Sequence, residues 1–236
     1  MTPRPVYLLA GATATGKSAV AAVLAREMGA AILSADSMLV YRGMDVGTAK
    51  PPPEERAEFS MGGVDLVTPA EDFSSGEWLR RAAQWAATIP AERPIVVVGG
   101  TGLYFTALLR GLDEPWAQPP PEYPVLRMDR ARLRERLMRR IDAMFDSGLE
   151  AEVARLRAEH PRWSRTAAAA IGYKEFFAPP DVPGRSVREA IYYRTSKFAK
   201  RQDTWFRHQA TPIYVEPTIE SVRDCWHTHG PWQVRF

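Results

Sequence analysis

Residues 11–18 carry the clearest chemistry in the sequence, since they combine glycines with a lysine and a hydroxyl and read Gly-Ala-Thr-Ala-Thr-Gly-Lys-Ser. Gly11 and Gly16 permit a tight turn and a close approach of the backbone to a ligand. The N–H groups of such a loop, and the positive end of a helix that follows it, favour an anion. Lys17 adds an ammonium group for phosphate oxygens, and the Ser18 hydroxyl is a suitable Mg²⁺ ligand. The spacing therefore predicts a phosphate-binding loop, the alternative being a glycine turn that binds nothing.

Short apolar strands alternate with helices around this loop. An apolar run at residues 6–10 precedes the loop and a helical segment at residues 19–28 follows it, which is the context that a phosphate-binding loop requires. Further strands are expected at residues 30–34 and 94–98, the second of which is rich in β-branched residues. This alternation predicts an α/β fold, a parallel sheet of the P-loop NTPase type flanked by helices, with a helical C-terminal part.

Two polar side chains follow these strands, at the edge where a parallel sheet binds its ligands. Asp36 comes after the strand at residues 30–34 and is open to three interpretations: a metal partner, a general base, or the cap of the next turn. Thr101 stands in a Gly-Gly-Thr-Gly turn and either points into the site or caps the helix expected at residues 103–110.

A proline-rich stretch at residues 111–124 is expected to hold no helix or strand. We therefore divide the chain into a P-loop α/β core at residues 1–112, a connection at 113–124, and a part at 125–236 that adds helices and a final strand to the core. Hydrophobic periodicity predicts the remaining elements. They are helices at residues 54–59, 75–89, 126–145, 150–159, 186–208 and from 218 onward, and strands at 64–67 and 212–215.

Arginines are concentrated at residues 127–140 and 185–207. The first group lies on an amphipathic helix, where one arginine, Arg140 among the candidates, turns inward onto a phosphate or all of them face solvent. The second group alternates with aromatic residues, a pattern that suits RNA through phosphate contacts and base stacking, or else a solvated helix with its aromatic side chains in the core.

The remaining composition excludes other classes of protein. The single cysteine, Cys225, rules out an internal disulfide and suits a reducing compartment. No apolar stretch approaches membrane-spanning length, and the first apolar run leads into the glycine loop without a signal-peptide cleavage site. We therefore expect a cytoplasmic protein that does not bind a membrane.

Together, these blocks resemble the tRNA dimethylallyltransferase family, the isopentenyl transferases that modify the adenosine next to the anticodon. The resemblance rests on residues 11–18, 36–51 and 99–104, with further blocks in the same order at 136–153, 170–175 and 199–207. The block at residues 36–51 is long and matches almost throughout. The resemblance covers the chain from about Val6 to Arg207.

The resemblance implies a donor, dimethylallyl diphosphate, and an acceptor, the anticodon stem-loop of tRNA, with Mg²⁺ as cofactor and a monomeric enzyme. It implies that the donor diphosphate binds to Gly11, Thr13, Ala14, Thr15, Gly16, Lys17, Ser18 and Arg140, with Ser18 on the metal. It implies that Asp36 takes the proton from the adenine N6 and that Thr101 orients this amine. It also implies that Ser37, Met38, Lys200, Arg201 and Gln202 contact tRNA.

The sequence also departs from the family pattern. Ala12 stands where the family usually has proline, Ser18 where it usually has threonine, and residues 61–65 lack the usual histidine pair. The family usually has a long helical insertion before the arginine-rich helix, whereas here only the connection at 113–124 fills this place. Prenyl transfer to a free adenine nucleotide is therefore an alternative, and a P-loop small-molecule kinase and a non-enzymatic RNA-binding relative are further ones.

Overall fold

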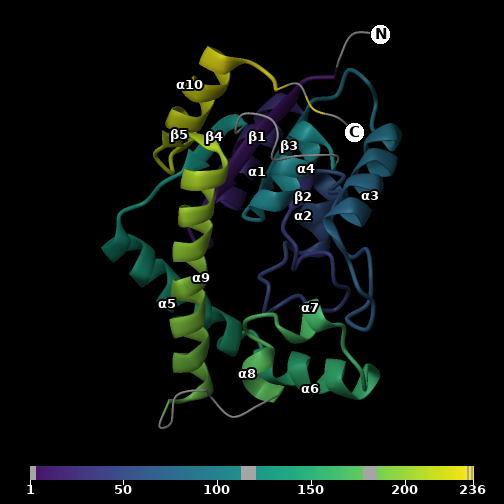
Figure 1. Ribbon diagram of the computed structural model, residues 1–236, viewed down its shortest axis with the longest axis vertical. Coiled ribbons are helices and arrows are strands. Elements are labelled where there is room, and N and C mark those ends of the chain that lie inside the picture. The colour runs from purple at the N-terminus through teal and green to yellow at the C-terminus, as the bar shows by residue number, and fades with distance from the viewer. Residues whose placement is uncertain (1–3, 113–120, 178–184, 233, 235) are drawn as a thin grey trace.

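A parallel sheet of five strands organises the protein (Figure 1). The computed structural model describes residues 4–112, 121–177, 185–232, 234 and 236. The strands are β1 (Val6–Gly11), β2 (Ala31–Ala35), β3 (Ile95–Gly99), β4 (Glu122–Leu126) and β5 (Thr211–Val215). They lie in the order β2-β3-β1-β4-β5 and all pairs are parallel, which confirms the predicted fold class.

The register of the sheet places the ends of three strands side by side. Gly99 of β3 lies opposite Ala10 of β1 on one side and opposite Ala35 of β2 on the other. Asp36 and Thr101 therefore leave the sheet at the same edge as the glycine loop after β1, as expected for carboxyl ends of parallel strands.

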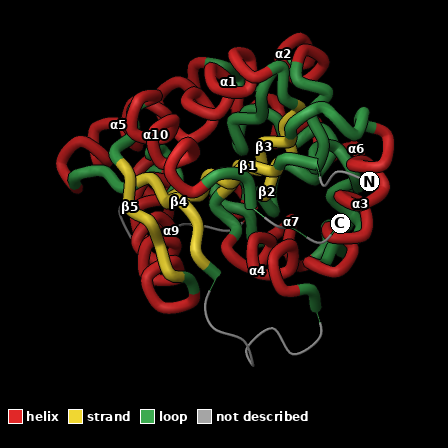
Figure 2. The backbone as a smooth tube through the Cα atoms, turned by 90° about the horizontal axis from the view of Figure 1, so that it is seen from above, coloured by secondary structure: helices red, strands yellow, loops and turns green. Residues whose placement is uncertain are grey.

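Helices cover both faces of the sheet (Figure 2). On one face, α1 (Lys17–Met28) and α10 (Ile219–His229) pack against the strands through Leu24 and Trp226. On the other face lie α3 (Ser75–Thr88), α4 (Gly102–Arg110) and the end of α9 (Val187–Gln209), with Trp78 and Phe105 fully buried. The short helix α2 (Pro53–Glu58) precedes α3 along the chain.

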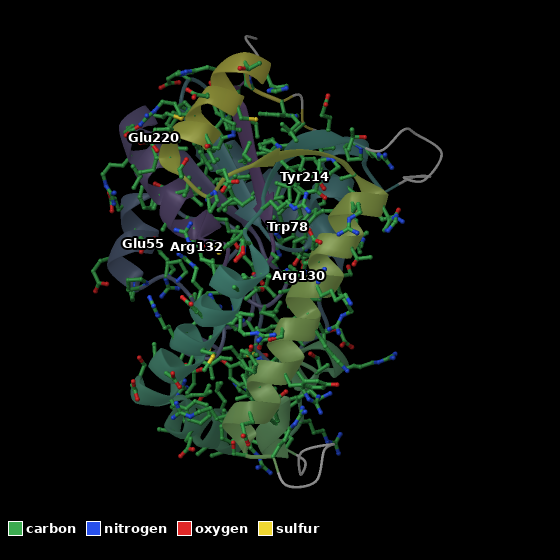
Figure 3. The ribbon with its side chains drawn as sticks, turned by 90° about the vertical axis from the view of Figure 1, so that its left-hand side faces the viewer. Glu55, Trp78, Arg130, Arg132, Tyr214 and Glu220 are labelled. Atoms are coloured by element: carbon green, nitrogen blue, oxygen red, sulfur yellow. The ribbon has the colours of Figure 1, made fainter. Side chains whose placement is uncertain are left out.

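A helical part extends from the carboxyl edge of the sheet. It contains α5 (Arg130–Asp146), α6 (Leu149–Glu159), α7 (Arg165–Ala168), α8 (Lys174–Phe177) and most of α9. Helices α5 and α9 run side by side below the sheet (Figure 3). Ser186 and Glu189 form a reciprocal capping box at the start of α9, which confirms the predicted start of this helix. Within the part of the chain that the structure describes, no helix is both long and apolar enough to cross a membrane.

Two predictions of local structure are wrong. Residues 122–126 form β4, although the stretch at 111–124 was expected to hold no strand; residues 113–120 of that stretch lie outside the described residues. Pro124 is tolerated because β1 pairs with β4 only from Val125 onward, so that the missing N–H of Pro124 removes no ladder hydrogen bond on that side. Leu126 is consequently the end of a strand, and the arginine-rich helix begins at Arg130.

The second correction concerns residues 64–67, which form no strand. Val67 makes only an isolated bridge to Tyr41. Residues 64–67 contain apolar side chains because Val67 packs into the hydrophobic core with Tyr41 of the loop that follows β2. The segment does not join the sheet. The other predicted helices and the strand at residues 212–215 are confirmed within a few residues at their ends.

Close packing between α4 and α9 generates the first prediction. A Cβ atom at Gly102 would lie 2.0 Å from Cε3 of the Trp205 ring, so we expect Gly102→Ala to lower the free energy of unfolding by about 1–3 kcal/mol. The control is Gly76→Ala at the start of α3, where a Cβ would meet only the flexible end of Leu112 and where we expect a change within about 0.5 kcal/mol. Urea unfolding measures both, and equal effects would contradict the packing argument.

Candidate active site

The glycine loop between β1 and α1 has the conformation of an anion-binding turn. Ala14 has a φ of 67° and Gly16 a φ of 97°, both in the left-handed region. Gly16 is the N-cap of α1 and no side chain caps this helix, so the N–H groups of its first turn remain available to a ligand. Inside the loop, the Thr15 hydroxyl donates to the Ala12 carbonyl at 2.8 Å. A Cβ at Gly11 would lie 3.0 Å from this Thr15 hydroxyl, which explains the first glycine.

The buried side chain of Gln202 joins this loop to the second glycine turn. Its Oε1 accepts hydrogen bonds from the Thr13 N–H at 2.9 Å and from the Thr13 hydroxyl at 3.1 Å. Its Nε2 donates to the Gly100 carbonyl at 2.9 Å, and a Cβ at Gly100 would lie 2.3 Å from this nitrogen. The amide of Gln202 is therefore enclosed between two turns of the protein, and the expected contact of Gln202 with tRNA stays a prediction.

Asp36 lies in the turn after β2, which is hydrogen-bonded to Thr101 at the start of α4. One Asp36 oxygen accepts the Met38 N–H at 2.9 Å. The Thr101 Oγ1 accepts the Ser37 N–H at 2.9 Å and lies 3.3 Å from the Ser37 hydroxyl, while the Thr101 N–H donates to Ala35. Thr101 occupies the N-cap position of α4 but its hydroxyl makes no cap hydrogen bond. The Thr101 side chain is therefore committed to positioning the residues next to Asp36.

Two cations face Asp36. Arg140 is the arginine of α5 that turns inward, and its Nη2 donates to the Thr48 carbonyl at 2.8 Å. Burial lowers the pKa of the Lys17 ammonium to about 8, against the opposing effect of the Asp36 charge and with a further lowering by Arg140. Burial also lowers the pKa of Arg140, and Asp36 again opposes the shift. An anion bound between Lys17 and Arg140 would favour the charged form of both.

The cavity at this edge of the sheet has two chambers. The larger, of about 530 Å³, has a mainly apolar wall with Ile141, Met144, Ile171, Ile191 and Phe198, and Ser37 and Met38 also line it. The smaller, of about 60 Å³, lies beside the glycine loop and is lined by Lys17, Ser18 and Ser34 among others. Thr13, Asp36, Thr48 and Arg140 line both. The carboxylate of Asp36 thus lines both a small polar chamber at the glycine loop, which also holds Lys17, Arg140 and Glu55, and a larger, mainly apolar one.

A third hollow lies along the exposed face of α9. It is an open groove of about 660 Å³ lined by Lys197, Lys200, Arg201, Thr204, Trp205, His208 and Gln209, which we call the α9 groove. Arg201 lines both this groove and the larger chamber. Lys200 and Arg201 are therefore exposed where the sequence predicted a nucleic-acid surface, and Arg201 lies between the groove and the chamber that holds Asp36.

Glu152 fixes the loop after Asp36, a role that is not evident from the sequence. This buried carboxylate of α6 accepts the N–H groups of Asp45, Val46 and Gly47 at 2.8–3.1 Å and the Tyr173 hydroxyl at 2.6 Å. A Cβ at Gly47 would lie 2.5 Å from Tyr173, so the glycine is required by this contact. Spacing alone gives no sign of it, because Glu152 reads as an ordinary acidic residue in the first turn of a helix.

The same loop is held from its other end by Lys50. The side chain of Lys50 is only 1% exposed, and its Nζ donates to the carboxylates of Asp45 and Asp65 at 2.6 Å each and to the Tyr41 carbonyl at 2.7 Å. A buried ammonium is stable only with such partners. The loop thus presents Ser37, Met38 and Thr48 to the chambers from a fixed backbone.

The fold and the site define a P-loop α/β protein that brings an anion-binding loop and a carboxylate together at an apolar chamber. Family models match nearly the whole chain: IPP transferase at residues 39–125 and 118–209, and isopentenyl transferase at residues 4–60. The tRNA dimethylallyltransferase of Streptococcus suis is 31% identical, covering 94% of this chain and 96% of the relative, and that of Thioalkalivibrio sulfidiphilus is 33% identical over 88% of each. The chain belongs to the tRNA dimethylallyltransferase family.

Solved structures agree in fold. A tRNA isopentenylpyrophosphate transferase from Bacillus halodurans has a TM-score of 0.80 at 24% identity, covering 95% of each chain. The corresponding transferase from Staphylococcus epidermidis has a TM-score of 0.79 at 23% identity, covering 95% of this chain and 98% of the other. At these identities, the similarity supports the architecture described above.

The comparisons also locate the shorter connection. The alignment with the Streptococcus suis relative has 286 positions. It includes 94% of the 236 residues of this chain, which is only about 222 residues. About sixty positions of the alignment thus have no counterpart in this chain. The IPP transferase model matches in two pieces that meet at residues 118–125, which places the shortening at the predicted connection.

The lowered pKa of Lys17 generates the second prediction. As the pH rises through about 8, Lys17 of the free protein loses its proton, whereas a bound diphosphate favours the ammonium. An alkyl diphosphate should therefore bind with proton uptake at pH 9 and with little at pH 7, since its own last proton dissociates near pH 6. Calorimetry in two buffers of different ionisation enthalpy measures this uptake.

The matched control for this measurement is Lys17→Arg. The guanidinium stays charged at both pH values, so the uptake at pH 9 should disappear in this variant. Uptake that persists unchanged would assign the proton to another group and remove Lys17 from the diphosphate site.

Proposed function

We propose that this protein transfers the dimethylallyl group of dimethylallyl diphosphate to N6 of the adenosine next to the tRNA anticodon, at position 37, and releases diphosphate. One observation carries the proposal: Asp36 lines both the polar chamber at the glycine loop, where Lys17 and Arg140 lie, and a larger, mainly apolar chamber. A carboxylate between a diphosphate and an apolar group is placed to accept a proton from a nucleophile that attacks the carbon joining the two. The relatives named tRNA dimethylallyltransferase support the choice of donor and acceptor.

The donor binds with its diphosphate on the glycine loop. The free N–H groups at the start of α1, together with Lys17 and Arg140, compensate the negative charge of the diphosphate. The dimethylallyl group then extends into the larger chamber, where Ile141 and Met144 of α5 offer apolar contact. Because the charge on the diphosphate grows as it leaves, the same cations stabilise the transition state.

The residues around the small chamber fit a hydrated Mg²⁺ ion carried by the diphosphate. Ser18 offers a hydroxyl at the loop, and the buried Ser34 hydroxyl, which lines the same chamber, makes no hydrogen bond within the described residues. Mg²⁺ keeps several waters and takes few protein ligands when it binds through phosphates, so one serine ligand and one serine contact to a metal-bound water suffice. The ion would supply charge neutralisation for the departing diphosphate.

In the proposed chemical step, Asp36 is the general base. The N6 lone pair forms the bond to the allylic carbon, the bond from this carbon to the diphosphate oxygen breaks with its electron pair, and the N6 proton passes to the Asp36 carboxylate. Thr101 acts through the Ser37 turn and keeps Asp36 oriented toward the two chambers. The donor's leaving diphosphate stays on Lys17 and Arg140.

The α9 groove supports RNA as the acceptor. Lys197, Lys200 and Arg201 offer phosphate contacts and Trp205 an aromatic face beside them. Because Arg201 lines both the groove and the larger chamber, a stem-loop held in the groove has the chamber of Asp36 beside it, and the acceptor nucleotide would flip out of the stem-loop to enter it. All of these residues belong to one chain, so we propose that a monomer, bound to the anticodon stem-loop, carries out the reaction.

The shortened connection favours one alternative, transfer to a free adenine nucleotide. The chain lacks about sixty positions that the Streptococcus suis relative has, and fewer contacts to a large RNA would leave a small acceptor as the substrate. The basic α9 groove opposes this alternative, since a single nucleotide does not need an extended cationic surface.

Matched reactions with two acceptors test the proposal. With dimethylallyl diphosphate and Mg²⁺, we expect N6-dimethylallyl adenosine in unmodified tRNA that carries adenosine at position 37, and none from AMP or ATP. Mass spectrometry of the nucleosides measures the product. The control tRNA has guanosine at position 37 and should remain unmodified, whereas product on the free nucleotide alone would establish the alternative.

Asp36→Asn tests the proposed base. We expect turnover to fall by roughly 10²–10⁴-fold, the usual contribution of a general base, while diphosphate affinity is retained because the asparagine oxygen can still accept the Met38 N–H. Single-turnover rates measure the first effect and calorimetry with inorganic diphosphate the second. Asp72→Asn, at an exposed position, is the control. Normal turnover in Asp36→Asn would eliminate Asp36 as the base.

A further inference from the structure

Arg136 of α5 reaches the glycine loop although it lies far from it in sequence. Its Nε donates to the Ala14 carbonyl at 2.8 Å, a contact between residues 122 positions apart. Ala14 has a φ of 67°, a left-handed conformation that non-glycine residues rarely adopt, so this hydrogen bond acts on an unfavourable part of the loop backbone.

The guanidinium of Arg136 also lies over Gly16. Its Nη2 is 3.2 Å, and its Cζ 3.7 Å, from the position that a Cβ at Gly16 would take. Gly16 is the N-cap of α1, where the N–H groups that bind an anion begin. Arg136 is exposed, and its terminal nitrogens make no hydrogen bond or ion pair within the described residues, so they can contact an anion beside the loop.

The apex of the loop is consequently held from two sides. Gln202 of α9 accepts both polar hydrogens of Thr13, and Arg136 of α5 binds the carbonyl of the next residue, Ala14. Helices α5 and α9, which supply these two side chains, pack against each other (Figure 3). The loop conformation thus depends on side chains from the second half of the chain.

Arg136 precedes Arg140 by four residues, so the two side chains lie on the same face of α5. Arg140 donates to the carbonyl of Thr48, which lines both chambers, and Arg136 donates to the Ala14 carbonyl of the glycine loop. Arg139 between them points to solvent, with its side chain 81% exposed. The helix therefore directs a pair of guanidinium groups, and not arginines in general, toward the anion-binding loop.

We propose that Arg136 is a further residue of the donor site, which holds the glycine loop through Ala14 and adds its positive charge to the diphosphate. The inference rests on the proposed function for the identity of the anion, and it assigns to α5 a second guanidinium besides Arg140. A planar guanidinium with free terminal donors is well suited to diphosphate oxygens.

Variants of Arg136 test this role with Mg²⁺ and inorganic diphosphate as the probe. We expect Arg136→Ala to weaken diphosphate binding by roughly tenfold, the loss of one charge-assisted contact. Arg136→Lys should recover most of this loss and Arg136→Gln should not, because the glutamine keeps a donor for Ala14 but carries no charge. Arg139→Ala is the matched control on the same helix and should bind diphosphate as the unmodified protein does. Calorimetry at pH 7.5 measures all four.

Steady-state kinetics separates this role from an RNA contact. The KM for dimethylallyl diphosphate should rise roughly tenfold in Arg136→Ala, while the KM for tRNA stays unchanged. A rise confined to the KM for tRNA, or an Arg136→Ala variant that matches Arg139→Ala in diphosphate affinity, would overturn the inference. Full recovery by Arg136→Gln would reduce Arg136 to a loop contact without an electrostatic role.

The experiment also separates this inference from the proposed function. If the unmodified protein fails to bind diphosphate or to modify tRNA, the proposed function itself is wrong. If the unmodified protein does both and Arg136→Ala binds diphosphate equally well, only the role assigned to Arg136 is wrong. Circular dichroism and thermal unfolding of each variant identify any loss that comes from misfolding.

Discussion

The buried amide of Gln202 is the interaction on which the site depends. It accepts two hydrogen bonds from Thr13 and donates one to Gly100, and thereby joins the turn after β1 to the turn after β3. A buried amide stripped of these partners would cost more free energy than a single hydrogen bond contributes, so the three contacts form or fail together. Because Gln202 belongs to α9, these hydrogen bonds connect the helix with the basic groove directly to the glycine loop.

The local parts of this arrangement are readable in the sequence, and the long-range parts are not. The glycine loop and strands β1, β2, β3 and β5 follow from spacing and hydrophobic pattern over a few residues, and they are where the pattern predicts them. Gln202 looks like one more polar residue of a basic helix, and only the fold shows that its side chain turns inward. Strand β4 was missed because Pro124 argues against a strand until the register with β1 is known.

The contacts of Glu152 and Lys50 explain why separate blocks of the sequence have to occur together. Glu152 of α6 satisfies three backbone N–H groups of the loop after Asp36, and Tyr173 donates to the same carboxylate. The loop could not keep this path without Gly47, where a side chain would collide with Tyr173. Most of the block at residues 36–51 thus serves to fix the backbone of this loop. Asp36 is the carboxylate of the block that lines both chambers.

The electrostatics of the site determine which part of the function survives the shortened connection. Lys17 and Arg140 are both half-buried, which lowers the pKa of each, and the Asp36 carboxylate opposes this shift. A diphosphate supplies the negative charge that this pair lacks, so the site is complementary to an anion before any RNA arrives. The helices and strands that build it lie outside residues 113–124, where the connection is short. The residues of the proposed donor site are therefore separate from the shortened connection, and the proposed acceptor surface lies on α9, where Arg201 lines both the basic groove and the larger chamber.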